Sequence, residues 1–133
     1  MTSSDGRTKA LECARAALDK KAVDLVVLDV GALTSIADYL VICTGKSDRQ
    51  VQAIAQAVET ELREQGERPV AIEGMARGQW VLIDGADVIV HVFYKPVREF
   101  YDLERLWEHA PRVQLPEPLR TQALGFNSES AAL

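Results

Sequence analysis

The segment Thr44-Gly45-Lys46-Ser47 could bind phosphate, because it places a glycine, a lysine and a hydroxyl where a predicted strand gives way to a helix. The N-terminus of a helix attracts anions through its free N–H groups. A phosphate-binding loop of the G-x-x-x-x-G-K-[ST] type needs a further glycine upstream of Gly45, and this sequence lacks it. Helix capping explains the serine without any ligand. We therefore interpret the segment as a strand-to-helix turn capped by Ser47.

Asp84 and Asp87 could contribute to metal-dependent chemistry. Enzymes that transfer nucleotides combine a Gly-Ser loop with two carboxylates one residue apart. Two-metal chemistry needs carboxylates that converge on ions about 4 Å apart. Asp84 and Asp87 are instead separated by Gly85-Ala86, and no Asp-x-Asp or Glu-x-Asp pair follows Ser47. The spacing favours a turn between two strands.

The histidines and cysteines do not form a catalytic pattern. His91 lies inside an apolar run, which is typical of a hydrogen-bonded residue in a sheet, and His109 lies at the predicted end of a helix. Cys13 and Cys43 are too few for a zinc-thiolate site. The sequence therefore predicts no nucleophile triad, no metal site and no cofactor, and we do not expect an enzyme.

Hydrophobic periodicity predicts the elements that position these residues. Helices are expected at 8–20, 48–65 and 96–109, and strands at 23–30, 39–44, 69–72, 79–84 and 87–94. This order, α-β-β-α-β-β-β-α, predicts an α/β fold with a mixed five-stranded sheet and three main helices. Strands 39–44 and 69–72 flank a helix and should run parallel, whereas the other strands should form hairpins. Three helices cannot be expected to cover both faces of the sheet fully.

The buried stripe of the second helix is expected at Val51, Ile54, Ala55, Val58 and Leu62, with Gly66 as its left-handed cap, and that of the last helix at Phe100, Leu103, Leu106 and Trp107. In the turn between the last two strands, Gly85 is expected to supply a positive φ.

Composition indicates one domain and a protein partner. The chain has 133 residues, 47% of them hydrophobic, and a net charge of -5. An acidic chain is poorly suited to broad nucleic-acid binding and is better matched to a basic protein. No apolar run is long enough for a membrane span, and the polar start does not resemble a signal peptide. We expect a cytoplasmic protein.

Trp80 is the strongest candidate for a binding residue. It alternates with Val81 and Ile83, so it shares one face of its strand with Leu82 and Asp84. If that face is incompletely covered, Trp80 is an aromatic anchor, a common role for tryptophan in interfaces. If a helix covers it, Trp80 belongs to the core. The sequence alone does not favour either alternative.

Several blocks, read in order, resemble the ribosomal silencing factors, also called the Iojap family. The resemblance covers about residues 8–110. It rests on DYLVICTG at 38–45, Ser47 with RQV at 49–51, Glu73-Gly74, GQWVLID at 78–84, DVIVHVF at 87–93 and REFYDLERLW at 98–107. This resemblance implies a silencing factor domain at 1–110. Residues 111–133, with Pro111, Pro116 and Pro118, are expected to form an extended or disordered tail.

The family resemblance also implies a function. It implies a nucleotidyltransferase-like fold without transferase chemistry, which binds the large ribosomal subunit through ribosomal protein fourteen. Binding there would block joining of the small subunit and lower translation when nutrients are scarce. The resemblance further implies a homodimer in isolation. An assembly factor for the large subunit is the first alternative, and a nucleotidyltransferase enzyme is a weaker one.

Nine residues are expected to form the partner-binding surface. Trp80 and Leu82 would be the apolar anchor, and Met75 and Arg77 would line its rim. Asp84 and Glu104 would pair with lysine or arginine of the partner. The edge would be completed by Tyr94, Arg98 and Tyr101.

Overall fold

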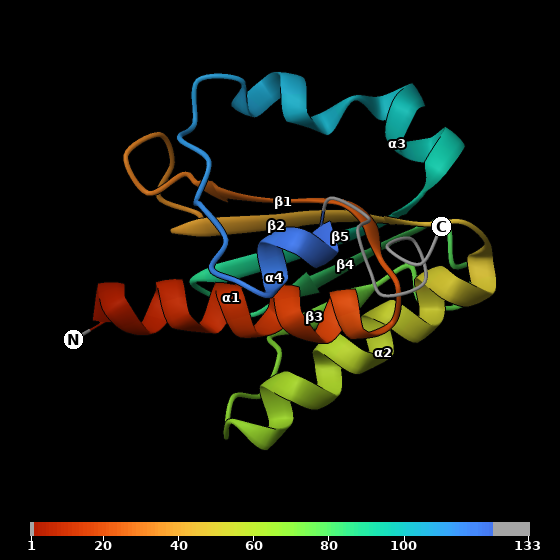
Figure 1. Cartoon of the computed structure of the whole chain (residues 1–133), viewed down its shortest axis with the longest axis horizontal. Coiled ribbons are helices and arrows are strands. Elements are labelled where there is room, and N and C mark those ends of the chain that lie inside the picture. The colour runs from red at the N-terminus through yellow and green to blue at the C-terminus, as the bar shows by residue number, and fades with distance from the viewer. Residues whose placement is uncertain (1, 124–133) are drawn as a thin grey trace.

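The computed structural model describes residues 2–123 as a mixed five-stranded sheet with helices on both faces (Figure 1). The predicted α/β class and the order α-β-β-α-β-β-β-α are confirmed. The strands are β1 (Val23–Asp29), β2 (Tyr39–Gly45), β3 (Ala71–Glu73), β4 (Trp80–Asp84) and β5 (Val88–Tyr94). The helices are α1 (Thr2–Asp19), α2 (Asp48–Glu64), α3 (Lys95–Tyr101), the 3-10 helix η1 (Leu103–Trp107) and α4 (Leu119–Ala123).

The sheet has the order β1-β2-β5-β4-β3, so β2 and β5 lie at its interior. β2 pairs with β5 in parallel, and the β1–β2, β4–β5 and β3–β4 pairs are antiparallel. β3 therefore runs in the same direction as β2, as predicted. The two strands are not neighbours, however, because β5 and β4 lie between them.

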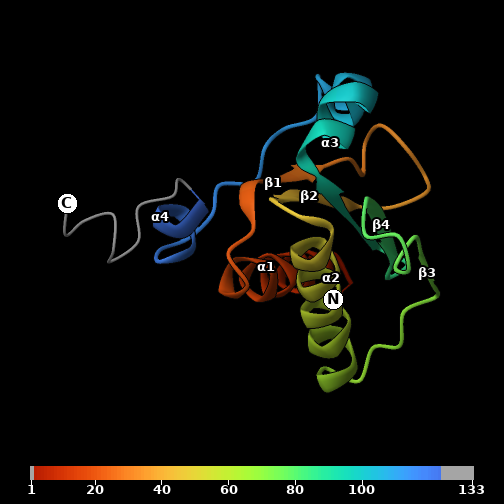
Figure 2. The same cartoon turned by 90° about the vertical axis from the view of Figure 1, so that its right-hand side faces the viewer.

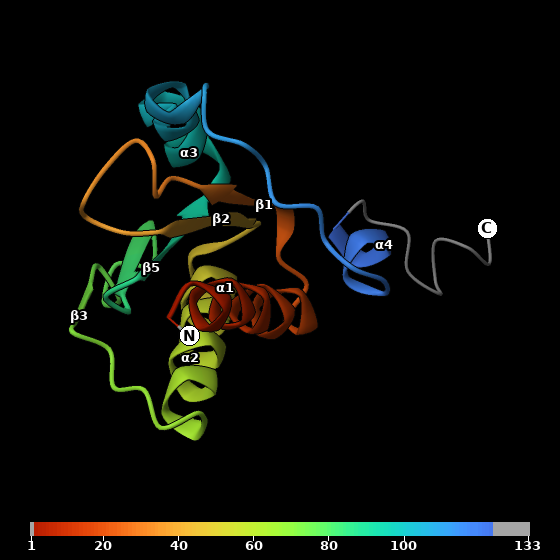
Figure 3. The same cartoon turned by 90° about the vertical axis from the view of Figure 1, so that its left-hand side faces the viewer.

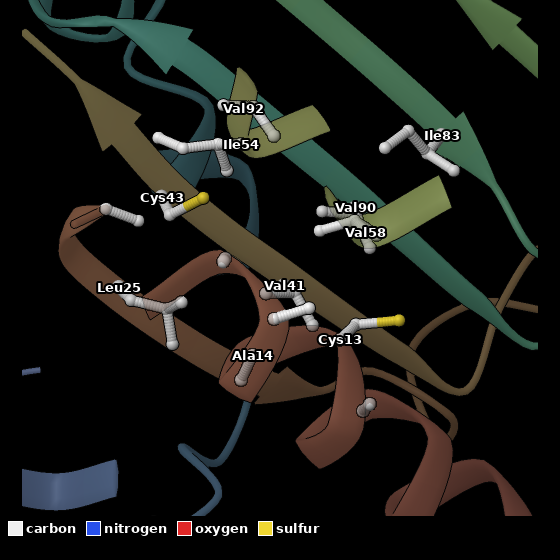
Figure 4. Packing of buried hydrophobic residues seen from close by; sticks show 14 of the residues in the cluster. Cys13, Ala14, Leu25, Val41, Cys43, Ile54, Val58, Ile83, Val90 and Val92 are labelled. Carbon is white, nitrogen blue, oxygen red and sulfur yellow. The ribbon is translucent and has the colours of Figure 1, made fainter. Parts of the chain in front are cut away.

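Helices α1 and α2 cover one face of the sheet, which we call the inner face (Figures 2 and 3). The stripe predicted for α2 is confirmed, because Val51, Ile54, Ala55, Val58 and Leu62 are all buried. They pack against the inward residues of the strands, among them Val41, Cys43, Val90 and Val92 (Figure 4). Burial raises the pKa of Cys13 and of Cys43 to about 12, so both thiols stay protonated at neutral pH.

The opposite, outer face is covered only in part. Its buried cluster contains Leu28, Leu40, Ile42 and Phe93, and Leu103 and Trp107 of η1 pack against it. This cover lies over β1, β2 and the end of β5 (Figure 1). On β4, the outward residues Trp80, Leu82 and Asp84 all remain partly exposed. The expected open region therefore lies at the β4 side of this face.

The turn from β2 into α2 is a helix cap, as predicted. The Ser47 hydroxyl accepts a hydrogen bond from the Gln50 backbone N–H at 3.1 Å, and the Gln50 side chain accepts one from the Lys46 N–H at 2.7 Å. Gly45 is required by close packing, because a Cβ there would lie 2.9 Å from both the backbone nitrogen and Cγ2 of Val51. Gly66 follows α2 with φ +80, which makes it the predicted left-handed cap.

The turn between β4 and β5 differs from the prediction in one detail. The positive φ belongs to Ala86, at +74, and not to Gly85. Asp84 stabilises this turn, because its Oδ1 accepts a hydrogen bond from the Ala86 N–H at 2.9 Å. Gly85 is needed for space, since a Cβ there would lie 3.0 Å from the Val88 carbonyl oxygen.

The prediction of one continuous helix at 96–109 is wrong, because the structure has two shorter helices there, α3 and η1. Asp102 adopts a left-handed conformation, with φ 50 and ψ 51, and separates α3 from η1. Aspartate tolerates this conformation better than most residues, so no glycine marks the break. The break changes the expected buried stripe: Leu103 and Trp107 pack inward, whereas Phe100 and Leu106 are exposed.

The segment after Pro111 differs from the expectation of an extended or disordered tail. The Asp29 N–H donates to the Pro111 carbonyl, and the Val113 N–H donates to the Val27 carbonyl, each at 2.8 Å. The chain then reaches α4, whose Leu119 is buried in the inner-face cluster beside α1. Prolines interrupt the periodicity here, so these tertiary contacts have no local sequence signal. The rest of the predicted tail, 124–133, lies outside the described residues.

Leu119→Ala tests whether this segment contributes to the fold. Leu119 is buried, so we expect the free energy of unfolding to fall by about 2 kcal/mol. Leu106→Ala is the matched control, because Leu106 is exposed and its loss should cost less than about 0.5 kcal/mol. Urea unfolding of both variants measures the difference. Equal stabilities would show that α4 does not pack on the domain.

Candidate functional site

Four apolar side chains form a partly exposed surface on the β4 side of the outer face. We call it the aromatic surface, and it comprises Trp80, Leu82, Phe100 and Tyr101. The Trp80 ring centroid lies 4.9 Å from that of Tyr101, and Phe100 meets Tyr101 edge-on at 5.0 Å. Phe100 is 80% exposed and Tyr101 is 55% exposed. Strand β4 and helix α3, which are distant in sequence, together position this surface.

Trp80 combines the two roles that the sequence left open. Its ring packs on the fully buried Phe93, its cross-strand partner on β5, with centroids 4.9 Å apart. Its outer side remains partly exposed and contacts Tyr101. Trp80 thus packs against the buried cluster of the outer face and also contributes to the aromatic surface. Phe100 was missed by the sequence analysis, because its burial was expected from helical spacing that Asp102 interrupts.

His91 lies beneath the aromatic surface and fixes the Trp80 indole. The Trp80 Nε1–H donates a hydrogen bond to His91 Nδ1 at 3.0 Å. His91 is directly opposite Leu82 on β4 and Ile42 on β2, so it has apolar neighbours on both sides. Burial lowers the pKa of His91 to about 4. The imidazole is therefore neutral at pH 7, as expected for a hydrogen-bonded residue of the sheet.

Arg98 and Glu104 bind each other instead of lying free for a partner. Arg98 donates to both carboxylate oxygens of Glu104, at 3.2 and 2.7 Å, which lowers the pKa of Glu104. Its Nη1 also donates to the Asp24 carbonyl at 2.6 Å and to the Thr44 hydroxyl at 2.8 Å. Arg98 is buried. This arrangement fastens α3 and η1 to strands β1 and β2, and it thereby holds Tyr101 in place.

The other predicted site residues are divided between the two faces. Leu82 and Asp84 share the outer face with Trp80. Met75 and Tyr94 pack against the inner-face cluster instead, so they do not join the aromatic surface. Arg77 is exposed in the loop before β4. Gln52 of α2 holds this loop, because its side chain donates to the carbonyls of Met75 and Ala76.

The residues considered for catalysis have structural roles. Ser47 caps α2, Asp84 stabilises the hairpin turn, and Asp87 accepts a hydrogen bond from Lys9 Nζ at 2.8 Å. Within residues 2–123, His, Cys, Asp and Glu side chains form no group of three that could hold a metal ion. No helix in this part of the chain is long and apolar enough to cross a membrane.

Comparison with known proteins decides the family. The family model described as "Ribosomal silencing factor during starvation" matches residues 3–132. The chain belongs to the ribosomal silencing factor family. This membership confirms the resemblance seen in the sequence blocks, and it makes the chain a non-enzymatic silencing factor.

Relatives and solved structures agree with this membership. The chain is 45% identical over 97 residues to the ribosomal silencing factor of Bacillus subtilis, covering 73% of this chain and 82% of that protein. It is 36% identical over 107 residues to the chloroplastic Iojap protein of Arabidopsis thaliana, covering 80% of this chain and 44% of that one. A crystal structure of a protein from Chromobacterium violaceum has 38% identity and a TM-score of 0.73, covering 88% of this chain and 92% of that one.

Arg98→Met tests the anchoring role of Arg98 in this silencing factor. The substitution removes the hydrogen bonds to Thr44 and Asp24 and leaves the Glu104 carboxylate without its partner. We expect the free energy of unfolding to fall by about 3 kcal/mol. Arg105→Met is the control, since Arg105 is exposed in η1 and should cost less than about 0.5 kcal/mol. Arg98 would be an ordinary surface residue if both variants unfolded at the wild-type urea concentration.

The lowered pKa of His91 predicts a loss of stability in mild acid. The pKa is about 4 in the folded protein, compared with the ordinary histidine value of 6.5. Between these values the unfolded chain binds more protons, so stability decreases as the pH falls. From pH 7 to pH 5, His91 should reduce the free energy of unfolding by about 2 kcal/mol. Urea unfolding at both pH values should show this decrease in the wild type and not in His91→Phe. An equal decrease in that variant would assign it to other groups.

Proposed function

We propose that this silencing factor binds the large ribosomal subunit through ribosomal protein fourteen and sterically blocks joining of the small subunit. Translation would thereby decrease under nutrient limitation, in the cytoplasm where the ribosomes act. The observation that carries the proposal is the aromatic surface, an exposed apolar patch on the half-covered face of the sheet. Such patches are typical of protein-interaction sites.

The composition of the surface suits a protein partner. Tryptophan and tyrosine bury a large area while losing few rotamers, and both are frequent among residues that dominate binding energy. Here the Trp80 indole is held by His91 and Phe93, so little ordering is required when a partner binds. Phe100 and Tyr101 project from α3 beside it.

Acidic residues next to the surface favour a basic partner. Glu73 lies opposite Leu82 on the neighbouring strand and is exposed, and Asp84 follows on the same face of β4. The chain carries a net charge of -5, which repels the phosphates of RNA. A basic ribosomal protein therefore fits this surface better than ribosomal RNA does.

The proposed mechanism requires affinity for the large subunit and a domain large enough to exclude the small subunit, but no catalysed reaction. A folded domain fixed on the subunit-joining surface excludes the small subunit by occupying its space. In the absence of ribosomes, we propose that two copies form a homodimer, because an exposed apolar patch tends to be covered by a second surface. Light scattering at micromolar concentration measures the expected doubled mass.

Sedimentation of ribosomal subunits tests the proposal. Large subunits are incubated with this protein, small subunits are added, and the mixture is separated on a sucrose gradient. The protein should migrate with the large subunit and reduce the joined peak. Joining at the control level would contradict the proposal. Binding restricted to immature large subunits would favour the assembly alternative.

Phe100→Ala tests the aromatic surface without disturbing the core, because Phe100 is 80% exposed. We expect affinity for the large subunit to fall by about 10-fold or more. Ile36→Ala is the matched control. Ile36 is 72% exposed in the loop before β2. This loop contacts the chain at the start of β5, whereas Trp80 pairs with Phe93 near the end of β5, so Ile36 lies away from the aromatic surface. Equal binding by both variants would place the contact elsewhere.

Glu73→Lys tests the electrostatic part of the proposal. A lysine beside Leu82 would repel a basic partner, so affinity should decrease, and more strongly at low salt than at high salt. Glu64→Lys makes the same charge change on α2, on the inner side of the sheet, and should have a much smaller effect. Titration of large subunits at two salt concentrations distinguishes them. The charge model would fail if both reversals weakened binding equally.

A further inference from the structure

We propose that His91 is a binding residue of the aromatic surface, whose Nε2–H donates a hydrogen bond to a backbone carbonyl of the docking protein. The inference rests on the proposed function and deepens it, because it specifies one polar contact within a largely apolar interface. It follows from the hydrogen bond of the other ring nitrogen, from the exposure of Nε2 and from the apolar surroundings.

Trp80 determines which nitrogen of His91 carries the proton. Its indole Nε1–H can only donate, so the His91 nitrogen that it contacts at 3.0 Å must accept. A neutral imidazole has one donor and one acceptor nitrogen. With Nδ1 as the acceptor, the proton lies on Nε2. Trp80 therefore acts as a positioning residue for His91 as well as a part of the surface.

The His91 Nε2 reaches the protein surface. In residues 2–123, every buried side-chain nitrogen or oxygen atom has a hydrogen-bond partner. His91 is buried as a residue, at 8% exposure, and the Trp80 contact involves Nδ1 alone. Nε2 makes no hydrogen bond within these residues, so it is not fully buried and keeps some access to solvent. A partner covering the aromatic surface would remove water from this donor, and it must supply an acceptor in return.

The surroundings of His91 favour a neutral acceptor. Its direct neighbours across the sheet are Leu82 and Ile42, and Phe93 is stacked at 6.1 Å. Desolvation is the cause of its lowered pKa, with no charge contributing. A partner carboxylate would be costly to bury in this environment, whereas a backbone carbonyl is neutral. The same geometry gives specificity, because a partner without an acceptor at this point leaves the Nε2–H unsatisfied.

Two measurements on the full chain test the inference. Long-range proton–nitrogen spectra of the imidazole at pH 7 report which ring nitrogen is protonated, and they should show the proton on Nε2. The affinity for purified large subunits is then measured for the wild type, His91→Phe and His91→Gln. Phenylalanine keeps a ring but has no donor, whereas glutamine can place an amide nitrogen at the ε position. Circular dichroism confirms that each variant is folded.

We expect His91→Phe to bind about 5- to 30-fold more weakly and His91→Gln to stay within about threefold of the wild type. A role limited to holding the Trp80 indole would also be rescued by glutamine, because the amide oxygen can accept the Nε1–H. His91→Phe is therefore repeated in a Trp80→Phe background, where loss of the Nε2–H donor should still weaken binding, and the absence of further weakening would overturn the inference. A proton on Nδ1, wild-type affinity of His91→Phe, or equal weakening of both folded variants would each overturn the inference. Failure of the wild type itself to bind large subunits would instead defeat the proposed function.

Discussion

The parallel pairing of β2 with β5 is the constraint on which the rest of the fold depends. The two strands match in register from Tyr39 with Val88 to Gly45 with Tyr94, and every residue of β2 is buried. β1 adds to one side of this pair and the β4–β3 hairpin to the other. The register of β4 against β5 then places Trp80 on Phe93 and Leu82 opposite His91. The positions of Trp80 and Leu82 in the aromatic surface are therefore set by the register of the central strands.

The two faces of the sheet are covered unequally, and the proposed docking surface lies on the less covered face. The inner face is closed by α1, α2 and α4, whereas α3 and η1 cover only the β1–β2–β5 part of the outer face (Figure 1). Arg98 holds α3 over this part of the sheet, because its side chain donates hydrogen bonds to Asp24 of β1 and Thr44 of β2. The uncovered part is apolar and is bordered by the carboxylates of Glu73 and Asp84. The proposed steric block would use this surface and would need no catalytic centre.

Local signals in the sequence predicted the elements that depend on local physics. The Ser47 cap, the buried stripe of α2 and the β4–β5 hairpin follow from capping, periodicity and turn composition, and all three are present. The break at Asp102 was not predictable, since its left-handed conformation carries no glycine. Arg98 was expected at the edge of the interface because it lies near the start of the last predicted helix, and Glu104 was expected to pair with a basic residue of the partner. Their mutual hydrogen bonds depend on tertiary contacts with β1 and β2. Phe100 was not predicted to be exposed, because its exposure follows from the break of the helix at Asp102.

Photo-crosslinking from the aromatic surface tests the central claim most directly. Phe100 is replaced by a photo-crosslinking phenylalanine analogue, and the same analogue replaces Glu64 on α2 as the control. After irradiation with large ribosomal subunits, the analogue in place of Phe100 should crosslink to ribosomal protein fourteen, and the one in place of Glu64 should not. Crosslinking to that protein from the Glu64 site, or only to other components from the Phe100 site, would contradict docking through the outer face.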